Sequence, residues 1–253
     1  MKIKAISVRS STDDFAINSL LPALQGYYNS IKEPDTEVDF VFPRKGARLM
    51  DQQYWESLYT SYIMELINEV DENVYDGVLI LCLLDACLIA AKERLNIPVV
   101  GLLQSSLALA YNLGRRVTIL QPKATSSNVR GAIGPGGGSH DVQDKARLYG
   151  MDNILVSVRC MQATGLEVDN SNEEQRNEIL LAAKQAVEED GTDVLILGCG
   201  AMFGMVDFLK DKLGIPVIDP NVAALKTIEI LIKMRLSQSK SAYPRPNLEA
   251  MER

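Results

Sequence analysis

The chain has 253 residues, of which 47% are hydrophobic and 23% charged, and its formal net charge at pH 7 is −7. This composition is typical of a globular protein with room for one large domain or two smaller ones. The sequence has no basic stripe and no apolar run of roughly 18 residues, so we expect no nucleic-acid partner and no membrane partner.

Short runs rich in Val, Ile and Leu alternate with helix-length segments along the whole chain. Such alternation is typical of βαβ units with parallel strands. The expected strands are residues 3–8, 37–42, 78–81, 99–102, 117–120, 154–158, 194–197 and 217–218. The first strand starts too close to Met1 to leave room for the apolar part of a signal peptide, so we expect a cytoplasmic protein.

The helices expected between these strands carry apolar stripes that suit packing on a sheet. Asp13 and Asp14 place acids at the start of the first helix, and Asp51 is the expected cap of the second. The expected stripe of that second helix consists of Tyr54, Leu58, Tyr62, Leu66 and Val70. Two further helices are expected over residues 173–189 and 222–236.

One seven-residue phrase occurs twice, and each copy ends in a cysteine. Asp-Gly-Val-Leu-Ile-Leu-Cys ends at Cys82, and Asp-Val-Leu-Ile-Leu-Gly-Cys ends at Cys199. A helix-length stretch follows each copy and leads to a second related phrase, at 96–101 and 214–219. The chain therefore consists of two related halves.

The repeat predicts an α/β fold with two pseudo-symmetric lobes, each a parallel sheet flanked by helices, and an active site in the cleft between them. The expected first lobe comprises 1–101 plus 219–253, and the second comprises 102–218. The glycine-rich segment 134–138 is expected to be a flexible connection, because it lacks the residues of a phosphate-binding loop. The tail from residue 237 is expected to be weakly ordered or held by a neighbouring subunit of a homo-oligomer.

The two repeat cysteines each end a strand at the edge where parallel sheets place their ligands. If the halves face each other, Cys82 and Cys199 approach one cleft from opposite sides. This arrangement suits removal of a proton from one face of a carbon and delivery of a proton to the other, which inverts a stereocentre. A helix that starts after each cysteine is expected to lower the thiol pKa from its usual value of about 8.5.

The remaining cysteines predict no further chemistry. Cys87 is expected inside the helix after Cys82, and both it and Cys160 are expected to be buried, inert thiols. The four cysteines match no zinc-ligand spacing, and His140 is the single histidine, so we expect no metal site. Neither a disulfide framework nor a nucleotide-binding motif is expected, so we expect no cofactor.

Four stretches of the chain resemble the aspartate/glutamate/hydantoin racemase family, and most closely its hydantoin and allantoin racemase branch. They are residues 34–38 with Pro43, 82–85 leading to 97–101, the turn at 198–202, and 213–219. The resemblance covers nearly the whole length. It implies an isomerase that inverts a carbon stereocentre of a small-molecule substrate, either a hydantoin-like ureide or an amino acid, without a cofactor, with Cys82 and Cys199 as a thiol and thiolate pair.

One departure from that branch concerns the loop after the first strand. Where the branch usually has an Asn-Pro-Asn-Thr-Ser run, this chain has Ser7, Val8, Arg9, Ser10 and Ser11. Arg9 is a candidate for binding a substrate carboxylate through two hydrogen bonds, and the alternative is a solvated loop cation. Ser10 and Ser11 are expected at the same edge of the cleft.

The other candidate substrate contacts surround the two cysteines. Leu83 is bulkier than the small residues common after the first cysteine. Asp85 is either a residue that orients the Cys82 thiol or a helix cap, and Gln121 either reaches a ureido or amide group of the substrate or caps a turn. Three small residues are expected to let the backbone approach an oxyanion: Gly198, Gly200 and Ala201.

Three other functions remain open at this point. A cis-trans isomerase of the maleate type also uses two cysteines in this fold, whereas the related decarboxylases have one. The third alternative is a non-catalytic two-lobed ligand-binding protein in which both cysteines are core thiols.

Overall fold

The computed structural model describes residues 1–123, 140–164 and 172–247. The glycine-rich segment 134–138 therefore lies outside the described residues. Among the described residues, no helix is both long and apolar enough to cross a membrane.

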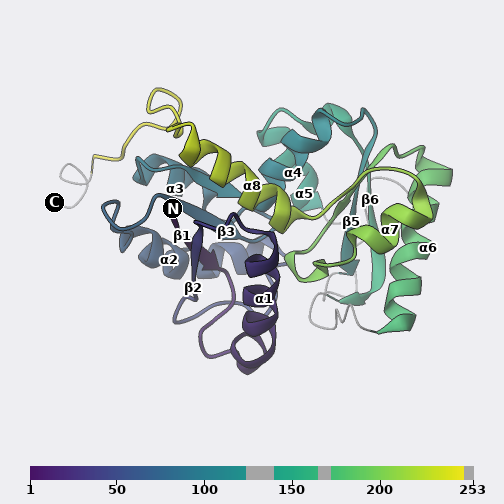
Figure 1. Ribbon diagram of the computed structural model, residues 1–253, viewed down its shortest axis with the longest axis horizontal. Helices are drawn as coiled ribbons and strands as arrows, with labels where there is room; N and C mark the ends of the chain where they lie inside the picture. Colours follow the sequence, from purple (N-terminus) through teal and green to yellow (C-terminus); the bar gives the residue numbers. More distant parts are fainter. Residues whose placement is uncertain (124–139, 165–171, 248–253) are drawn as a thin grey trace.

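The chain forms two lobes, each built on a four-stranded parallel sheet (Figure 1). In the first lobe β1 (Lys2–Ser7), β2 (Glu37–Val41), β3 (Gly77–Leu81) and β4 (Val99–Gly101) lie in the order β2-β1-β3-β4. In the second, β5 (Val117–Lys123), β6 (Leu155–Thr164), β7 (Val194–Leu197) and β8 (Val217–Ile218) lie in the order β6-β5-β7-β8. The two orders are equivalent, and every strand expected from the sequence is present. The predicted fold class is confirmed.

Helices follow most of the strands. In chain order they are α1 (Leu21–Ile31), which continues a π-helical turn over Ala16–Leu20, then α2 (Gln53–Asn68), α3 (Leu88–Arg94), α4 (Leu102–Tyr111), α5 (His140–Leu148), α6 (Glu173–Asp190), α7 (Val206–Leu213) and α8 (Pro220–Lys233). Short 3-10 turns cover Asp152–Ile154 and Gly200–Met202.

Helix α6 matches the prediction from its apolar stripe. It buries Ile179, Ala182 and Ala183, which lie three and four residues apart. The Asn172 side chain accepts hydrogen bonds from the backbone N–H groups of the first turn, and Gly191 ends the helix with a φ of 66°.

The predicted stripe and cap of α2 are wrong. Tyr54 and Leu58 are 65% and 48% exposed, whereas Glu56, Ile63 and Ile67 are buried. A row of residues four apart rotates by about 40° at each step around a helix with 3.6 residues per turn, so the expected row winds from the outer face to the inner one. The N-cap residue is Gln52 rather than the expected Asp51, and the Gln52 side chain makes no capping hydrogen bond.

Helices α4 and α8 pack against each other at the junction of the lobes. Helix α8 follows β8 of the second sheet, yet it lies on β3 and β4 of the first (Figure 1). Helix α4 follows β4 and contacts α5 and β7 of the second lobe as well as β3 and β4. The α8 contacts favour the proposed assignment of 219–253 to the first lobe, together with 1–101, and α4 bridges the proposed boundary with 102–218.

The C-terminal tail binds its own chain at the end of α3. The Lys240 ammonium donates to the carbonyl oxygens of Lys92, Glu93 and Leu95, at 2.6 to 3.0 Å. The Gln238 amide donates to the Leu95 carbonyl at 2.6 Å and accepts from the Val99 N–H at 3.1 Å. This part of the tail therefore closes the last turn of α3, where free carbonyl groups favour a cation.

Candidate active site

A cavity of about 150 Å³ lies where the carboxyl ends of the two sheets meet. The segments after β1 and β3 line it from the first lobe, and those at the ends of β5 and β7 line it from the second. Cys82 comes from the first lobe, and Cys199 comes from the second. The repeat in the sequence thus places one thiol from each lobe on the wall of one cavity.

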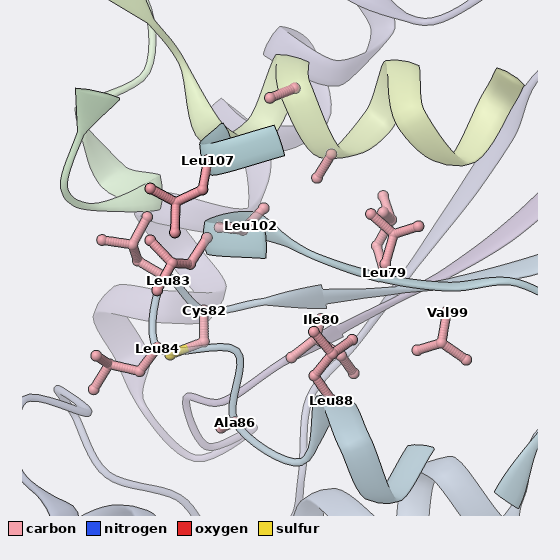
Figure 2. Packing of buried hydrophobic residues seen from close by; sticks show 14 of the residues in the cluster. Leu79, Ile80, Cys82, Leu83, Leu84, Ala86, Leu88, Val99, Leu102 and Leu107 are labelled. Carbon is pink, nitrogen blue, oxygen red and sulfur yellow. The ribbon is translucent and has the colours of Figure 1, made fainter. Parts of the chain in front are cut away.

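Cys82 follows β3 directly and lies in a tight turn that packs into the hydrophobic core. The N–H groups of Leu84 and Ala86 point towards its sulfur and favour the thiolate. Figure 2 shows Cys82 beside Leu83, Leu84 and Ala86, and its exposed fraction is only 8%. This burial outweighs the N–H groups and raises the pKa of Cys82 to about 12, and the nearby carboxylates of Asp85 and Glu56 raise it further.

Cys199 follows β7 and starts the 3-10 turn Gly200–Met202. The Ala201 N–H donates to the Cys199 sulfur at 3.5 Å. Burial raises the Cys199 pKa, while that N–H and the positive charge of Arg9 lower it. Cys199 therefore has a cation from the opposite lobe, whereas Cys82 has two acids. The surroundings favour a thiolate at Cys199 over one at Cys82.

The expected lowering of both thiol pKa values is wrong for the protein without substrate. Helix α3 begins at Leu88, six residues after Cys82, and Cys87 precedes it with a left-handed φ of 63°. Cys87 is therefore not inside a helix as expected. Because no long helix begins directly behind either thiol, a few N–H groups act against the full cost of burial.

Asp85 holds the Cys82 turn to the start of α4. Its carboxylate accepts hydrogen bonds from the N–H groups of Leu103 at 3.0 Å and Gln104 at 2.8 Å, and from the Tyr149 hydroxyl at 2.9 Å. A Cβ at Gly101 would lie 2.3 Å from a carboxylate oxygen of Asp85, so this close approach requires glycine. With 1% exposure, Asp85 is not among the cavity-lining residues, and we withdraw the expected substrate contact.

Asn221 fixes the Cys199 turn in an equivalent way. Its side chain lies at the start of α8, donates to the Gly200 carbonyl at 3.0 Å and accepts from the Tyr28 hydroxyl at 3.2 Å. Asp219 caps α8 through the Asn221 N–H at 2.8 Å. Each cysteine turn is thus attached to the first turn of the helix that follows the last strand of its own sheet.

Arg9 lines the cavity and is nearly buried. It is 8% exposed, and its Nε donates to Asp13 at 3.0 Å. Ser10 and Ser11, which were expected beside Arg9, are not part of the described cavity wall. The Ser10 hydroxyl contacts Thr12 and the Arg44 carbonyl, and Ser11 is exposed. They lie outside the wall because the chain turns away from the cavity after Arg9 and packs on the loop that follows β2.

The other candidates lie on the cavity wall. Leu83, Gln121, Gly198, Gly200 and Ala201 all line it. The Gly198 N–H donates to the Leu120 carbonyl at 2.6 Å, and a Cβ at Gly198 would lie 2.5 Å from that oxygen. The lack of a side chain at this position therefore lets the backbone that precedes Cys199 lie against Leu120 and Gln121 of β5.

Sequence reasoning missed several other residues of the wall. Two are cations, Arg48 and Lys123, and one is Cys160, which was expected to be inert in the core. The missed apolar residues are Val8, Leu20, Leu24, Phe42, Leu49, Met50, Leu81, Leu84, Leu102 and Pro122. Lys123 and Cys160 lie near the carboxyl ends of expected strands, which is a signal that could have identified them. Arg48 and Met50 belong to a long loop without such a signal.

Two parallel sheets that share a cavity at their carboxyl ends, with a cysteine from each sheet on its wall, define a two-lobed α/β protein. The chain belongs to the Asp/Glu/Hydantoin racemase family, whose sequence model matches residues 18–228. It is therefore a racemase, which is an isomerase.

Relatives in this family cover nearly the whole chain. Hydantoin racemase from Pseudomonas sp. (strain NS671) is 28% identical over 95% of this chain and 89% of the relative. Hydantoin racemase from Paenarthrobacter aurescens is 28% identical over 97% of this chain and 98% of the relative. The crystal structure of allantoin racemase from Pseudomonas fluorescens has the same fold, with a TM-score of 0.84 and 24% identity over 98% of this chain and 97% of that one.

Proposed function

We propose that this racemase inverts a carbon stereocentre of a hydantoin-like ureide, without a cofactor, and that Cys82 and Cys199 are its acid and base. One observation carries the proposal: the two thiols, from equivalent strand ends of the two lobes, line one cavity. The hydantoin racemases related to this chain supply the substrate class, and the cavity volume of about 150 Å³ suits a small molecule.

In the proposed reaction, one sulfur is a thiolate and the other a thiol. The thiolate removes the proton from the stereocentre, and the electron pair of the broken C–H bond moves into the adjacent carbonyl to form an enolate. The thiol on the opposite side then donates its proton to the other face of the carbon. The product leaves with inverted configuration, and the two sulfurs have exchanged protonation states.

The two thiols are not equivalent in the free enzyme. The charge of Arg9 and the Ala201 N–H favour the Cys199 thiolate, whereas Asp85 and Glu56 disfavour one at Cys82. We therefore assign Cys199 as the thiol that ionises more readily, so that the main reactive form of the free enzyme has a thiolate at Cys199 and a thiol at Cys82. One enantiomer reacts with this form, and its mirror image reacts with the form in which the proton has moved.

The pH dependence of the reaction follows from these pKa values. Burial raises the pKa of both thiols, so only a small fraction of Cys199 is thiolate at neutral pH. Because the thiolate is the base, kcat/KM is expected to rise by about tenfold per pH unit between pH 6 and pH 8. A polarimetric pH series measures this slope, and a flat profile over this range would contradict the assignment of a buried thiol as the base.

A substrate panel tests the proposed function itself. Enantiopure 5-substituted hydantoins, allantoin, aspartate and glutamate are incubated with the enzyme, before and after dialysis against a chelator, and the loss of optical rotation is followed. We expect turnover of at least one cyclic ureide, with the same rate after dialysis. Racemisation of the amino acids alone would contradict the ureide assignment, and activity that returns only with added metal would contradict a cofactor-free reaction.

A further inference from the structure

The described wall of the cavity carries a positive charge, although the chain as a whole has a formal net charge of −7. Three cations line it, Arg9, Arg48 and Lys123, and among the described residues of the wall the one acid is Asp51. This excess of cations attracts an anionic ligand, whereas it gives a neutral ring no net electrostatic attraction.

Arg9 is the cation that is buried and held in place. Its side chain is 10% exposed, Asp13 binds its Nε at 3.0 Å, and its guanidinium carbon lies 5.2 Å from the centre of the Phe15 ring. Within the described structure, its Nη2 is buried and has no hydrogen-bond partner. A buried donor without a partner is costly, and a guanidinium N–H recovers most when it binds an oxyanion.

The Arg9 side chain, whose Nη2 has no hydrogen-bond partner in the described structure, also affects one of the two proposed catalytic thiols. Arg9 is close enough to Cys199 for its charge to favour the thiolate. The described wall of the cavity as a whole carries three cations and one acid, which disfavours the ammonium group of a free amino acid compared with a ureide, whose nitrogens carry no charge.

We infer that the substrate is an anionic ureide, in which a hydantoin-like ring carries a carboxylate on the substituent at its stereocentre, and that Arg9 binds this carboxylate. Arg48 and Lys123, which are exposed, attract the anion to the cavity. The identity of the ring rests on the proposed function, but the anion site at Arg9 does not.

Alkylation of Cys199 measures the anion site without any turnover. Iodoacetate and iodoacetamide attack the same sulfur and differ in one negative charge. The rate of each at Cys199 is measured by peptide mass spectrometry, in the folded protein and in urea. The ratio of the iodoacetate rate to the iodoacetamide rate is expected to be about tenfold higher in the folded protein than in urea. This factor corresponds to one charge-assisted hydrogen bond, and we expect it to decrease with added salt.

Variants assign this preference to Arg9. Arg9→Gln is expected to remove it, Arg9→Lys to retain part of it, and the exposed control Arg147→Gln, which does not line the cavity, to leave it unchanged. If Arg9→Gln does not fold because Asp13 loses its partner, Arg48→Gln and Lys123→Gln replace it, each with an expected loss of about two- to threefold. Equal preference in folded and unfolded wild-type protein, or an unchanged preference in folded Arg9→Gln, would overturn the proposal.

A substrate pair then separates the anion site from the reaction. We expect a higher kcat/KM for 5-(carboxymethyl)hydantoin than for 5-propylhydantoin. Arg9→Gln is expected to lower kcat/KM for both substrates, because the Cys199 thiolate loses a favourable charge, and to lower it by about tenfold more for the acidic one. A clear preference for the neutral hydantoin would overturn the anionic substrate while leaving the racemase proposal in place. Racemisation of aspartate but of neither hydantoin would contradict the proposal of a ureide substrate and would leave the proposal of an anion site at Arg9 in place.

Discussion

Replacement of Cys199 by serine is expected to decrease the racemisation of both enantiomers by about 10²- to 10⁴-fold, and Cys82→Ser is expected to do the same. Each thiol accepts the proton of one enantiomer and donates a proton to the other, so one loss stops both directions. A serine hydroxyl occupies nearly the same space but ionises far less readily. Polarimetry with each enantiomer separately measures the effect.

Two other cysteines provide matched controls. Cys87 does not line the cavity, and its thiol donates a hydrogen bond to the Thr60 carbonyl oxygen at 3.8 Å. Cys87→Ser is expected to keep wild-type rates, and Cys160→Ser, which changes the cavity wall without removing either proposed acid or base, is expected to lose less than about tenfold. If Cys82→Ser or Cys199→Ser kept near wild-type turnover in both directions, the two-thiol mechanism would be wrong.

Asp85→Ala is expected to lower the free energy of unfolding by roughly 2 to 4 kcal/mol, because it removes the cap of α4 and leaves the buried N–H groups of Leu103 and Gln104 without an acceptor. Tyr149→Phe removes a single hydrogen bond to the same carboxylate and is expected to cost about 1 kcal/mol. Urea denaturation of both variants measures the difference. Equal stability of Asp85→Ala and wild type would show that this cap does not stabilise the lobe junction.

The pH dependence of stability adds a second readout for Asp85. Burial raises its pKa to about 6, although the three donors oppose this shift. The folded protein therefore binds a proton at Asp85 more readily than the unfolded chain, whose carboxyl pKa is about 4. This contribution to stability is complete below about pH 4 and is lost as the pH rises through about 6. Asp85→Ala is expected to lack that component of the pH dependence.

The sequence predicted those parts of the fold that depend on local patterns. Buried parallel strands are continuous apolar runs, so all of them could be found, and the repeated phrase placed Cys82 and Cys199 at equivalent strand ends. Helix α6 was predictable for the same reason, because its apolar residues recur with the helical period and its N-terminal cap is adjacent in sequence.

The sequence did not predict contacts that are made across the chain. Asp85 caps α4 from 18 residues away, and neither position carries a local sign of the other. The direction of the chain after Arg9 depends on its packing against the loop after β2, so Ser10 and Ser11 turned away while Arg48 joined the wall. The thiol pKa values depend on how deeply each sulfur is buried, which a strand-end position alone does not determine.

Solvent deuterium at the inverted carbon tests the central claim, a two-thiol racemisation, most directly. An enantiopure hydantoin that the enzyme accepts is incubated in D₂O, and the first product is analysed by chiral separation and mass spectrometry at low conversion. If the opposite thiol, in exchange with solvent, delivers the new proton, nearly every inverted molecule carries one deuterium while unreacted substrate carries almost none. Inverted product without deuterium, or equal labelling of substrate and product from the start, would contradict proton delivery by a second, opposed thiol.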